Sequence, residues 1–279
     1  MGNKPPTNRT GKKETKDKLE KAQKLGILSL SEHGLESLPP TVYELKTLRT
    51  LDLSNNKLIS LGRLHLLAEL KSLNLDGNKL LTGSLGPVSS LSKLQSLSVK
   101  NNKLGKSVQS EFGTVPPAPL PPMPSSLKQL YLTNNPLGAI PDSLLSGNLV
   151  KLELLDLSQT GVKEVPLELV LLTALQELRL DDNQIAFLPP NMGQLQKLKV
   201  LSLRNNQFHV TSTIFNETSN PQPIPASLFE ETPLIDLNLH GNKMTNTELN
   251  QFEGFQAFLD RRQKVKSKTL TNLDVCGLE

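Results

Sequence analysis

The side chains that most often catalyse reactions or bind metal ions are few in this sequence and widely separated. Cys276 is the single cysteine among 279 residues, and no nucleophile-elbow pattern is present. Asp181 and Asp182 form a carboxylate pair, but neighbouring residues on a strand point to different sides. The sequence therefore predicts no enzyme, no metal site and no cofactor. The four histidines lack metal-ligand spacing; they are His33, His65, His209 and His240.

The positive charge is concentrated at the two ends of the chain. Residues 1–24 carry a net charge of +5 and residues 261–268 another +5, while the total is +4, which leaves −6 for all other residues together. Gly11-Lys12-Lys13 lacks the glycine spacing and the Ser or Thr of a phosphate-binding loop. We therefore expect no nucleic-acid binding by the body of the protein. Binding of RNA or of an anionic membrane through the basic ends is the alternative function.

An internal repeat must position the remaining side chains. The pattern L-x-x-L-x-L-x-x-N-x-L occurs nine times. In its L-x-L part, alternation places the leucines inside and the intervening residues outside. Stacked copies predict an α/β solenoid of nine coils with a curved, parallel, concave β-sheet. The copies begin at Leu25, Leu48, Leu70, Leu94, Leu127, Leu152, Leu175, Leu198 and Leu234.

The Asn of the repeat turns the chain away from each strand. Its amide can pair with backbone groups that a tight, buried turn would otherwise leave unpaired. His33 replaces it in the first coil, where terminal repeats are commonly atypical, and Thr160 in the sixth coil can still donate and accept through its hydroxyl. An apolar residue precedes proline in several return segments, which predicts extended or turn conformations and no long helix there. These pairs are Leu38-Pro39, Ile140-Pro141, Val165-Pro166, Leu188-Pro189 and Ile224-Pro225.

The two end coils need covers because one coil cannot bury its own apolar face. Residues 14–24 predict a short polar helix at the N-terminal end. At the C-terminal end, apolar residues recur at spacings of three and four, which predicts one amphipathic helix. The predicted organisation is a flexible basic tail (1–13), a repeat domain with capping helices (14–266) and a C-terminal tail (267–279). The apolar residues of the C-terminal helix are Leu249, Phe252, Phe255, Phe258 and Leu259.

The repeats resemble those of the intracellular leucine-rich repeat proteins with 23-residue coils. The Met1-Gly2-Asn3 start, Gly34-Leu35 with Leu38-Pro39, and Phe252-Glu253-Gly254-Phe255 are similar to one subgroup of that family. The resemblance implies a protein-binding adaptor or scaffold, with small GTPases and phosphatases as partner classes by family analogy alone. We expect a monomer.

The outward positions of the strands form the predicted binding surface. Tyr and Arg often anchor interfaces, so Tyr131, Arg179 and Arg204 are the preferred candidates for a strong contribution. The alternative is that each of these side chains is merely solvated. The candidate residues are Asp52, Asn74, Asp76, Lys100, Tyr131, Asp156, Arg179, Asp181, Arg204, Asn238 and His240.

Location and membrane attachment depend on the ends of the chain. The lone cysteine and the lack of a secretory signal favour a reducing compartment, and we expect a cytoplasmic protein. Gly2 is a candidate for acylation, with the adjacent basic residues as the second signal for an anionic membrane. The usual motif has Ser or Thr at position six, whereas this chain has Pro6 and Thr7. A solvated tail without a lipid is the alternative.

Two repeat intervals contain insertions, at about residues 105–126 and 209–226. The first includes a proline-rich run, 116–124, with overlapping P-x-x-P spacings that favour a stiff polyproline II conformation. Such a segment can dock on an aromatic groove. No Arg adjoins the prolines to fix their orientation, so an ordinary loop between coils is the preferred interpretation.

Overall fold

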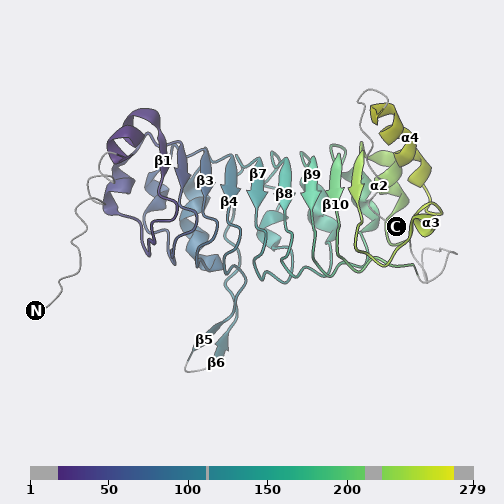
Figure 1. Cartoon of the computed structure of the whole chain (residues 1–279), viewed down its shortest axis with the longest axis horizontal. Helices are drawn as coiled ribbons and strands as arrows, with labels where there is room; N and C mark the ends of the chain where they lie inside the picture. The colour runs from purple at the N-terminus through teal and green to yellow at the C-terminus, as the bar shows by residue number, and fades with distance from the viewer. Residues whose placement is uncertain (1–17, 111–112, 211–221, 267–279) are drawn as a thin grey trace, which may run out of the picture.

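The chain folds into a solenoid whose strands lie side by side in one sheet (Figure 1). The computed structural model describes residues 18–110, 113–210 and 222–266. Nine parallel strands in the order β1-β2-β3-β4-β7-β8-β9-β10-β11 form the sheet, one from each predicted coil. The strands are β1 (Ile27–Ser29), β2 (Thr50–Asp52), β3 (Ser72–Asn74), β4 (Ser96–Ser98), β7 (Gln129–Tyr131), β8 (Leu154–Asp156), β9 (Glu177–Arg179), β10 (Val200–Ser202) and β11 (Asp236–Asn238).

The register of the sheet keeps equivalent residues of the repeat beside one another. Leu51 pairs with Leu73 and Leu73 with Leu97, so the central leucine of each strand lies beside that of the next. These leucines are 0–2% exposed along the whole sheet. The residues before and after them point to the opposite face of the sheet, because alternate side chains of a strand point to opposite faces. The predicted fold class is confirmed, and the outward residues form its concave face.

The prolines of the return segments are extended, as predicted, and short helices follow them that the sequence did not predict. Pro39, Pro141, Pro166, Pro189 and Pro225 each lie directly before a helix, with extended ψ angles between 133° and 154°. A proline costs little at this place, since the first amides of a helix have no intrahelical partner. The return helices are η1 (Pro40–Glu44), η2 (Leu64–Leu66), η3 (Thr82–Ser90), η4 (Asp142–Leu144), η5 (Leu167–Leu171), η6 (Pro190–Gln194), which are 3₁₀, and α2 (Ala226–Glu231).

A ladder of asparagines, all buried except the half-buried Asn242, joins neighbouring coils. Asn56 Nδ2 donates to Leu30 O at 2.8 Å in the preceding coil and to Leu53 O at 2.9 Å in its own. Its Oδ1 accepts from the backbone N–H groups of His33 and Leu35, at 3.1 and 2.9 Å. Each such side chain therefore pairs backbone groups that would otherwise be buried alone. Equivalent bonds come from Asn78, Asn102, Asn135, Asn183, Asn206 and Asn242.

Thr160 can replace the asparagine because the backbone amides of the preceding coil donate to backbone carbonyls instead of to a side chain. Thr160 Oγ1 donates to Leu157 O in its own coil at 2.6 Å. In the preceding coil, Leu137 N donates to Asn135 O at 2.8 Å and Gly138 N donates to Thr160 O at 2.9 Å. Those amides have backbone acceptors, so no side-chain amide oxygen is required at this point.

The residue before each ladder position adopts a left-handed conformation in all nine coils. Asp182, for example, has φ 55°, and its Oδ1 accepts from Asn205 Nδ2 at 2.7 Å. The carboxylate pair noted in the sequence is thereby explained: Asp181 belongs to the concave face and Asp182 to the turn. The residues with positive φ are Glu32, Asn55, Gly77, Asn101, Asn134, Gln159, Asp182, Asn205 and Gly241.

Both ends carry helices. Residues 18–25 are helical at the first coil, and Ala22 of this helix is buried. At the other end, the prediction of one amphipathic helix was wrong: α3 (Asn246–Leu249) and α4 (Phe255–Lys266) are separate. Gly254, at φ 78°, breaks the run. Phe255 and Phe258 of α4 lie 5.4 and 6.1 Å from the Phe229 ring of α2, between ring centroids.

The first insertion contains a hairpin that the sequence did not predict. Strands β5 (Val108–Ser110) and β6 (Gly113–Val115) pair antiparallel and project from the solenoid (Figure 1). The proline-rich run then returns to the coil, where Leu120 and Met123 are buried in the core. Most of the second insertion, the basic tail and Gly2 lie outside the described residues.

Candidate functional site

The structure places all eleven candidate residues on the concave face. Six of these residues are the last residue of a strand. The other five lie two residues after the last residue of a strand and face the same side. Parallel pairing in register stacks both sets into rows across the coils. The first row holds Asp52, Asn74, Tyr131, Asp156, Arg179 and Asn238, and the second holds Asp76, Lys100, Asp181, Arg204 and His240.

Four residues of the first row have a structural task. The side-chain oxygen of each accepts a hydrogen bond from the backbone N–H two residues on, as Asp and Asn do in turns. Asp156 is only 5% exposed, so little of its carboxylate can reach a partner. The bonds are Asp52 with Ser54 at 3.0 Å, Asn74 with Asp76 at 3.0 Å, Asp156 with Ser158 at 3.0 Å and Asn238 with His240 at 3.1 Å.

Two carboxylates of the second row connect neighbouring coils. Asp76 Oδ1 accepts from Ser98 Oγ at 2.6 Å and from Lys100 N at 2.7 Å. Asp181 Oδ1 accepts in the same way from Ser202 Oγ at 2.6 Å and from Arg204 N at 2.8 Å. These oxygens hold the sheet together, so the acidic candidates are first of all structural.

Lys100, Tyr131 and Arg179 gather with two carboxylates at the centre of the face. Lys100 Nζ lies 4.5 Å from the centroid of the Tyr131 ring, which is cation–π geometry. Arg179 Nε donates to Glu177 Oε1 at 2.6 Å, and the Arg179 side chain remains 46% exposed. Lys100, Tyr131, Asp156, Glu177 and Arg179 are contributed by four consecutive coils, those of β4, β7, β8 and β9. We call these five residues the central cluster.

The surroundings of Tyr131 and Arg179 raise the pKa of both side chains. Burial raises the pKa of the Tyr131 phenol, and the charges of Glu177 and Asp156 raise it further against the opposing effect of Arg179. Burial opposes the charge of Arg179, but the hydrogen bond and charge of Glu177 outweigh it and raise the guanidinium pKa. Tyr131 therefore offers a neutral hydroxyl, and Arg179 a permanent cation.

Sequence reasoning missed Glu177. It begins β9 and faces the same side as Arg179, two residues on, because side chains alternate along a strand. The alternation that places the last residue of each strand on the concave face applies to the first residue of the strand as well. Arg204 and His240 lie on the face but outside the central cluster.

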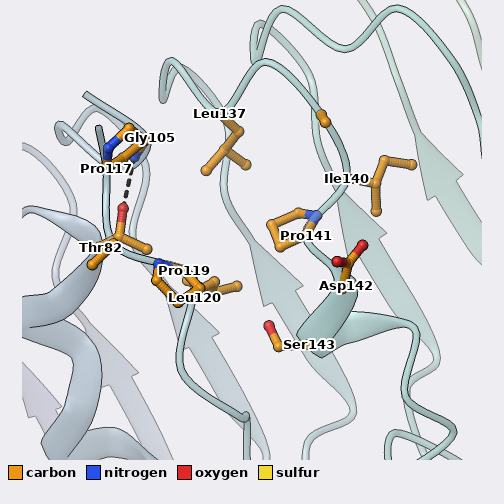
Figure 2. A pocket seen from close by; sticks show the side chains of 12 residues that line it. Thr82, Gly105, Pro117, Pro119, Leu120, Leu137, Ile140, Pro141, Asp142 and Ser143 are labelled. Carbon is orange, nitrogen blue, oxygen red and sulfur yellow. Dashed lines mark hydrogen bonds between the residues drawn. The ribbon is translucent and has the colours of Figure 1, made fainter. Parts of the chain in front are cut away.

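A pocket beside the proline-rich run is the second candidate. It has a volume of about 310 Å³. Figure 2 shows Pro119 and Leu120 on one side and Leu137, Ile140 and Pro141 on the other. Polar groups are few: the Asp142 carboxylate, the Thr82 hydroxyl, which accepts from Gly105 N at 2.8 Å, and Ser143 Oγ, which is buried without a hydrogen-bond partner among the described residues. This lining offers no arrangement for catalysis.

Neither metal binding nor membrane spanning has a counterpart in the described part of the chain. Within residues 18–110, 113–210 and 222–266, three or more His, Cys, Asp or Glu side chains never gather as a metal site would require. In the same ranges, every helix is too short or too polar to cross a bilayer.

Comparison with known proteins identifies the repeat. The model of the leucine rich repeat family matches residues 23–80 and 125–185. The chain is 35% identical to mouse podocan over 277 residues, which cover 90% of the chain and 42% of podocan. It is 30% identical to chicken lumican over 212 residues, which cover 74% of the chain and 55% of lumican. The chain thus spans less than two thirds of either relative.

Solved structures show the same fold at lower identity. An internalin of Listeria monocytogenes superposes with a TM-score of 0.61 at 21% identity, covering 85% of this chain and 61% of the internalin. The leucine-rich repeat chain in a complex of latrophilin 3, Unc5D and FLRT2 superposes with a TM-score of 0.60 at 19% identity, covering 82% of this chain and 72% of that one. These matches show the fold; the family model over residues 23–80 and 125–185, together with the nine stacked coils, shows that the chain is built of leucine-rich repeats.

Proposed function

We propose that this protein is a non-catalytic adaptor that binds a protein partner with the centre of its concave face. Leucine-rich repeat domains in general mediate protein–protein interaction. The observation that carries the proposal is the central cluster, in which an aromatic ring, two cations and two carboxylates from four consecutive coils meet. Tyr and Arg are enriched among residues that dominate binding energy. The FLRT2 repeat chain, found in a complex with other proteins, is consistent with this use of the fold.

The chemistry of the central cluster suggests the partner's complementary groups. Arg179 keeps part of its donor set exposed although it pairs with Glu177, and Lys100 presents its ammonium beside Tyr131. With these two cations included, the outward positions of the face hold six carboxylates and three cations, counting each strand's first and last residue and the second residue beyond. A partner segment with both an acidic and a basic group fits this alternation. The identity of that partner, including the GTPase and phosphatase classes, rests on analogy.

The proposal is tested by replacing the three preferred candidate residues together. We expect the triple variant Tyr131→Ala, Arg179→Ala, Arg204→Ala to lose its specific partners in proximity labelling from cells, with enrichment reduced by about tenfold or more. The matched control is Arg63→Ala, Lys163→Ala, Phe187→Ala, which removes one aromatic ring and two cations from exposed positions outside the sheet. An unchanged partner list in the first variant, or equal loss in the control, would contradict the proposal.

We further propose a cytoplasmic location with attachment to a membrane through an acylated Gly2. The lone cysteine and the basic residues that follow Gly2 support this part. We expect Gly2→Ala to shift the protein from the membrane fraction to the soluble fraction of cells. Metabolic labelling with a fatty-acid analogue is the accompanying measurement. Unchanged partitioning of the variant, or wild-type protein without label, would rule the lipid anchor out.

A further inference from the structure

The side of the solenoid where the strands begin is strongly basic. Three positions of each coil lie there: the two turn residues before the first leucine of the repeat, and the residue after that leucine. In coils two to eight these positions hold eight exposed cations and two carboxylates, although the body as a whole is acidic. We call this set the basic edge. Its cations are Lys46, Arg49, Lys71, Lys93, Lys128, Lys151, Lys197 and Lys199, and its acids are Glu69 and Glu153.

Backbone hydrogen bonds hold the basic edge in a continuous row. Lys71 N donates to Arg49 O at 2.7 Å, Gln95 N to Lys71 O at 2.8 Å and Lys128 N to Gln95 O at 2.8 Å. The same ladder continues through Glu153 to the eighth coil, where Lys199 N donates to Gln176 O at 2.8 Å. Because the strands stand side by side with their ends aligned (Figure 1), the cations share one flank of the molecule.

Few of these cations are neutralised within the protein. Lys93 Nζ pairs with Glu69 at 2.6 Å and Lys128 Nζ with Glu153 at 3.1 Å. Lys93 lowers the pKa of Glu69 by a hydrogen bond, and the nearby charges of Arg49 and Lys71 lower it further, although desolvation opposes them. One carboxylate thus lies in the field of three cations. The other cations of the basic edge form no ion pair within the described residues.

The neighbouring uncharged residues favour one class of anionic partner. Val150, in one of the edge positions, is 50% exposed, and Leu25, between the corresponding residues of the first coil, is 70% exposed. Exposed aliphatic side chains beside cations suit a lipid surface, where they can enter the headgroup region. Recognition of single-stranded RNA instead uses aromatic rings for base stacking. The three edge positions hold no aromatic residue in any of the nine coils.

We propose that the basic edge binds the surface of an anionic phospholipid bilayer, with the solenoid lying on its flank. The axis about which a solenoid of this kind bends is parallel to its strands. The starts of the strands therefore stay in one plane, and the basic edge can contact a flat surface along its whole length. The concave face then remains open to the side. This inference is independent of the partner-binding proposal, because it involves none of the concave-face residues.

The experiment uses the full chain without a lipid anchor and sedimentation with vesicles. Wild-type protein is expected to bind phosphatidylcholine vesicles that contain phosphatidylserine, and not pure phosphatidylcholine, with an affinity that falls as salt rises. Lys71→Gln, Lys151→Gln, Lys197→Gln, Lys199→Gln should weaken that binding on the order of tenfold to a hundredfold.

The matched control changes the same number of lysines where the strands end: Lys57→Gln, Lys79→Gln, Lys103→Gln, Lys243→Gln, all exposed. It has the same net charge as the edge variant and should bind the vesicles within about twofold of wild type. Equal weakening in the control would show a net-charge effect and overturn the proposal. Absence of wild-type vesicle binding, or tighter edge-dependent binding of a single-stranded RNA oligonucleotide, would overturn it as well.

Discussion

Asn183→Ala is expected to lower the free energy of unfolding by about 4 kcal/mol. Asn183 Oδ1 accepts from the backbone N–H groups of Thr160 and Val162, at 3.2 and 3.0 Å. Alanine leaves both donors buried without a partner, and each such loss costs about 2 kcal/mol. The loss of the Asn183 Nδ2 donor matters less, because the carbonyl of Leu157 to which it donates also accepts from Thr160 Oγ1.

Urea unfolding followed by circular dichroism measures this change. The matched control is Asn148→Ala, because Asn148 is exposed and its amide reaches only Ser146 Oγ, at 3.1 Å. We expect the control to stay within about 0.5 kcal/mol of wild type. A loss below about 1 kcal/mol for Asn183→Ala would mean that water or a shifted backbone satisfies the two amides, and that the ladder does not hold the coils together.

Gly105→Ala is expected to destabilise the protein by about 3 kcal/mol. Gly105 has φ 81°, and a Cβ atom there would lie 2.3 Å from Pro136 O and 2.7 Å from Leu137 Cα. Both are backbone atoms of the next coil, so the clash cannot be relieved by moving a flexible side chain. The substitution should therefore open the junction between the fourth and fifth coils, where the hairpin leaves the solenoid.

Two other glycines distinguish the cost of the left-handed conformation from the cost of the clash with the next coil. Gly138 has φ 76° but nothing within 4 Å of an added Cβ, so Gly138→Ala should cost only the left-handed conformation, about 1–2 kcal/mol. Gly86 has open space and no positive φ, so Gly86→Ala should be close to neutral. Thermal unfolding of the three variants is the measurement. Equal losses for Gly105→Ala and Gly138→Ala would show that the close approach of the coils contributes nothing.

The repeat pattern predicted the features that depend on local sequence. Leucine spacing set the number and register of the strands, and the Asn positions marked the ladder that joins the coils. Even the exception at Thr160 could be anticipated, because a hydroxyl can donate to the carbonyl that the amide normally meets. The sequence did not reveal why Thr160 can stand in place of the asparagine. In the coil before Thr160, the Leu137 N–H donates to the backbone carbonyl of Asn135 and needs no side-chain acceptor.

Features that depend on packing between distant segments were missed. The apolar spacing from Leu249 to Leu259 is helical throughout, but Gly254 turns the chain where a side chain would meet Glu230, Ala226 and Phe229 of another helix. Periodicity within one segment cannot reveal such a neighbour. The strands of the β5–β6 hairpin are three residues each, too short for an alternation signal to stand out.

The candidate site was predicted as a face but not as a cluster. Alternation placed all eleven residues on the concave side, yet it could not show that the acidic ones are bound to backbone amides while Lys100 approaches the Tyr131 ring. The basic edge could not be predicted from the sequence, because it too depends on which residues the fold brings side by side. Its cations come from six coils, with one or two in each, so they form no charged run in the sequence as the residues at the two ends do.

The affinity of the captured partner for the purified repeat protein tests the central claim most directly. We predict that Tyr131→Ala and Arg179→Ala each weaken binding about tenfold or more, and that Phe187→Ala, at an exposed aromatic outside the sheet, leaves the Kd unchanged within about twofold. Circular dichroism first establishes that the variants are folded. If Tyr131→Ala and Arg179→Ala bind as tightly as wild type, the partner does not use the centre of the concave face, and the proposed function is contradicted.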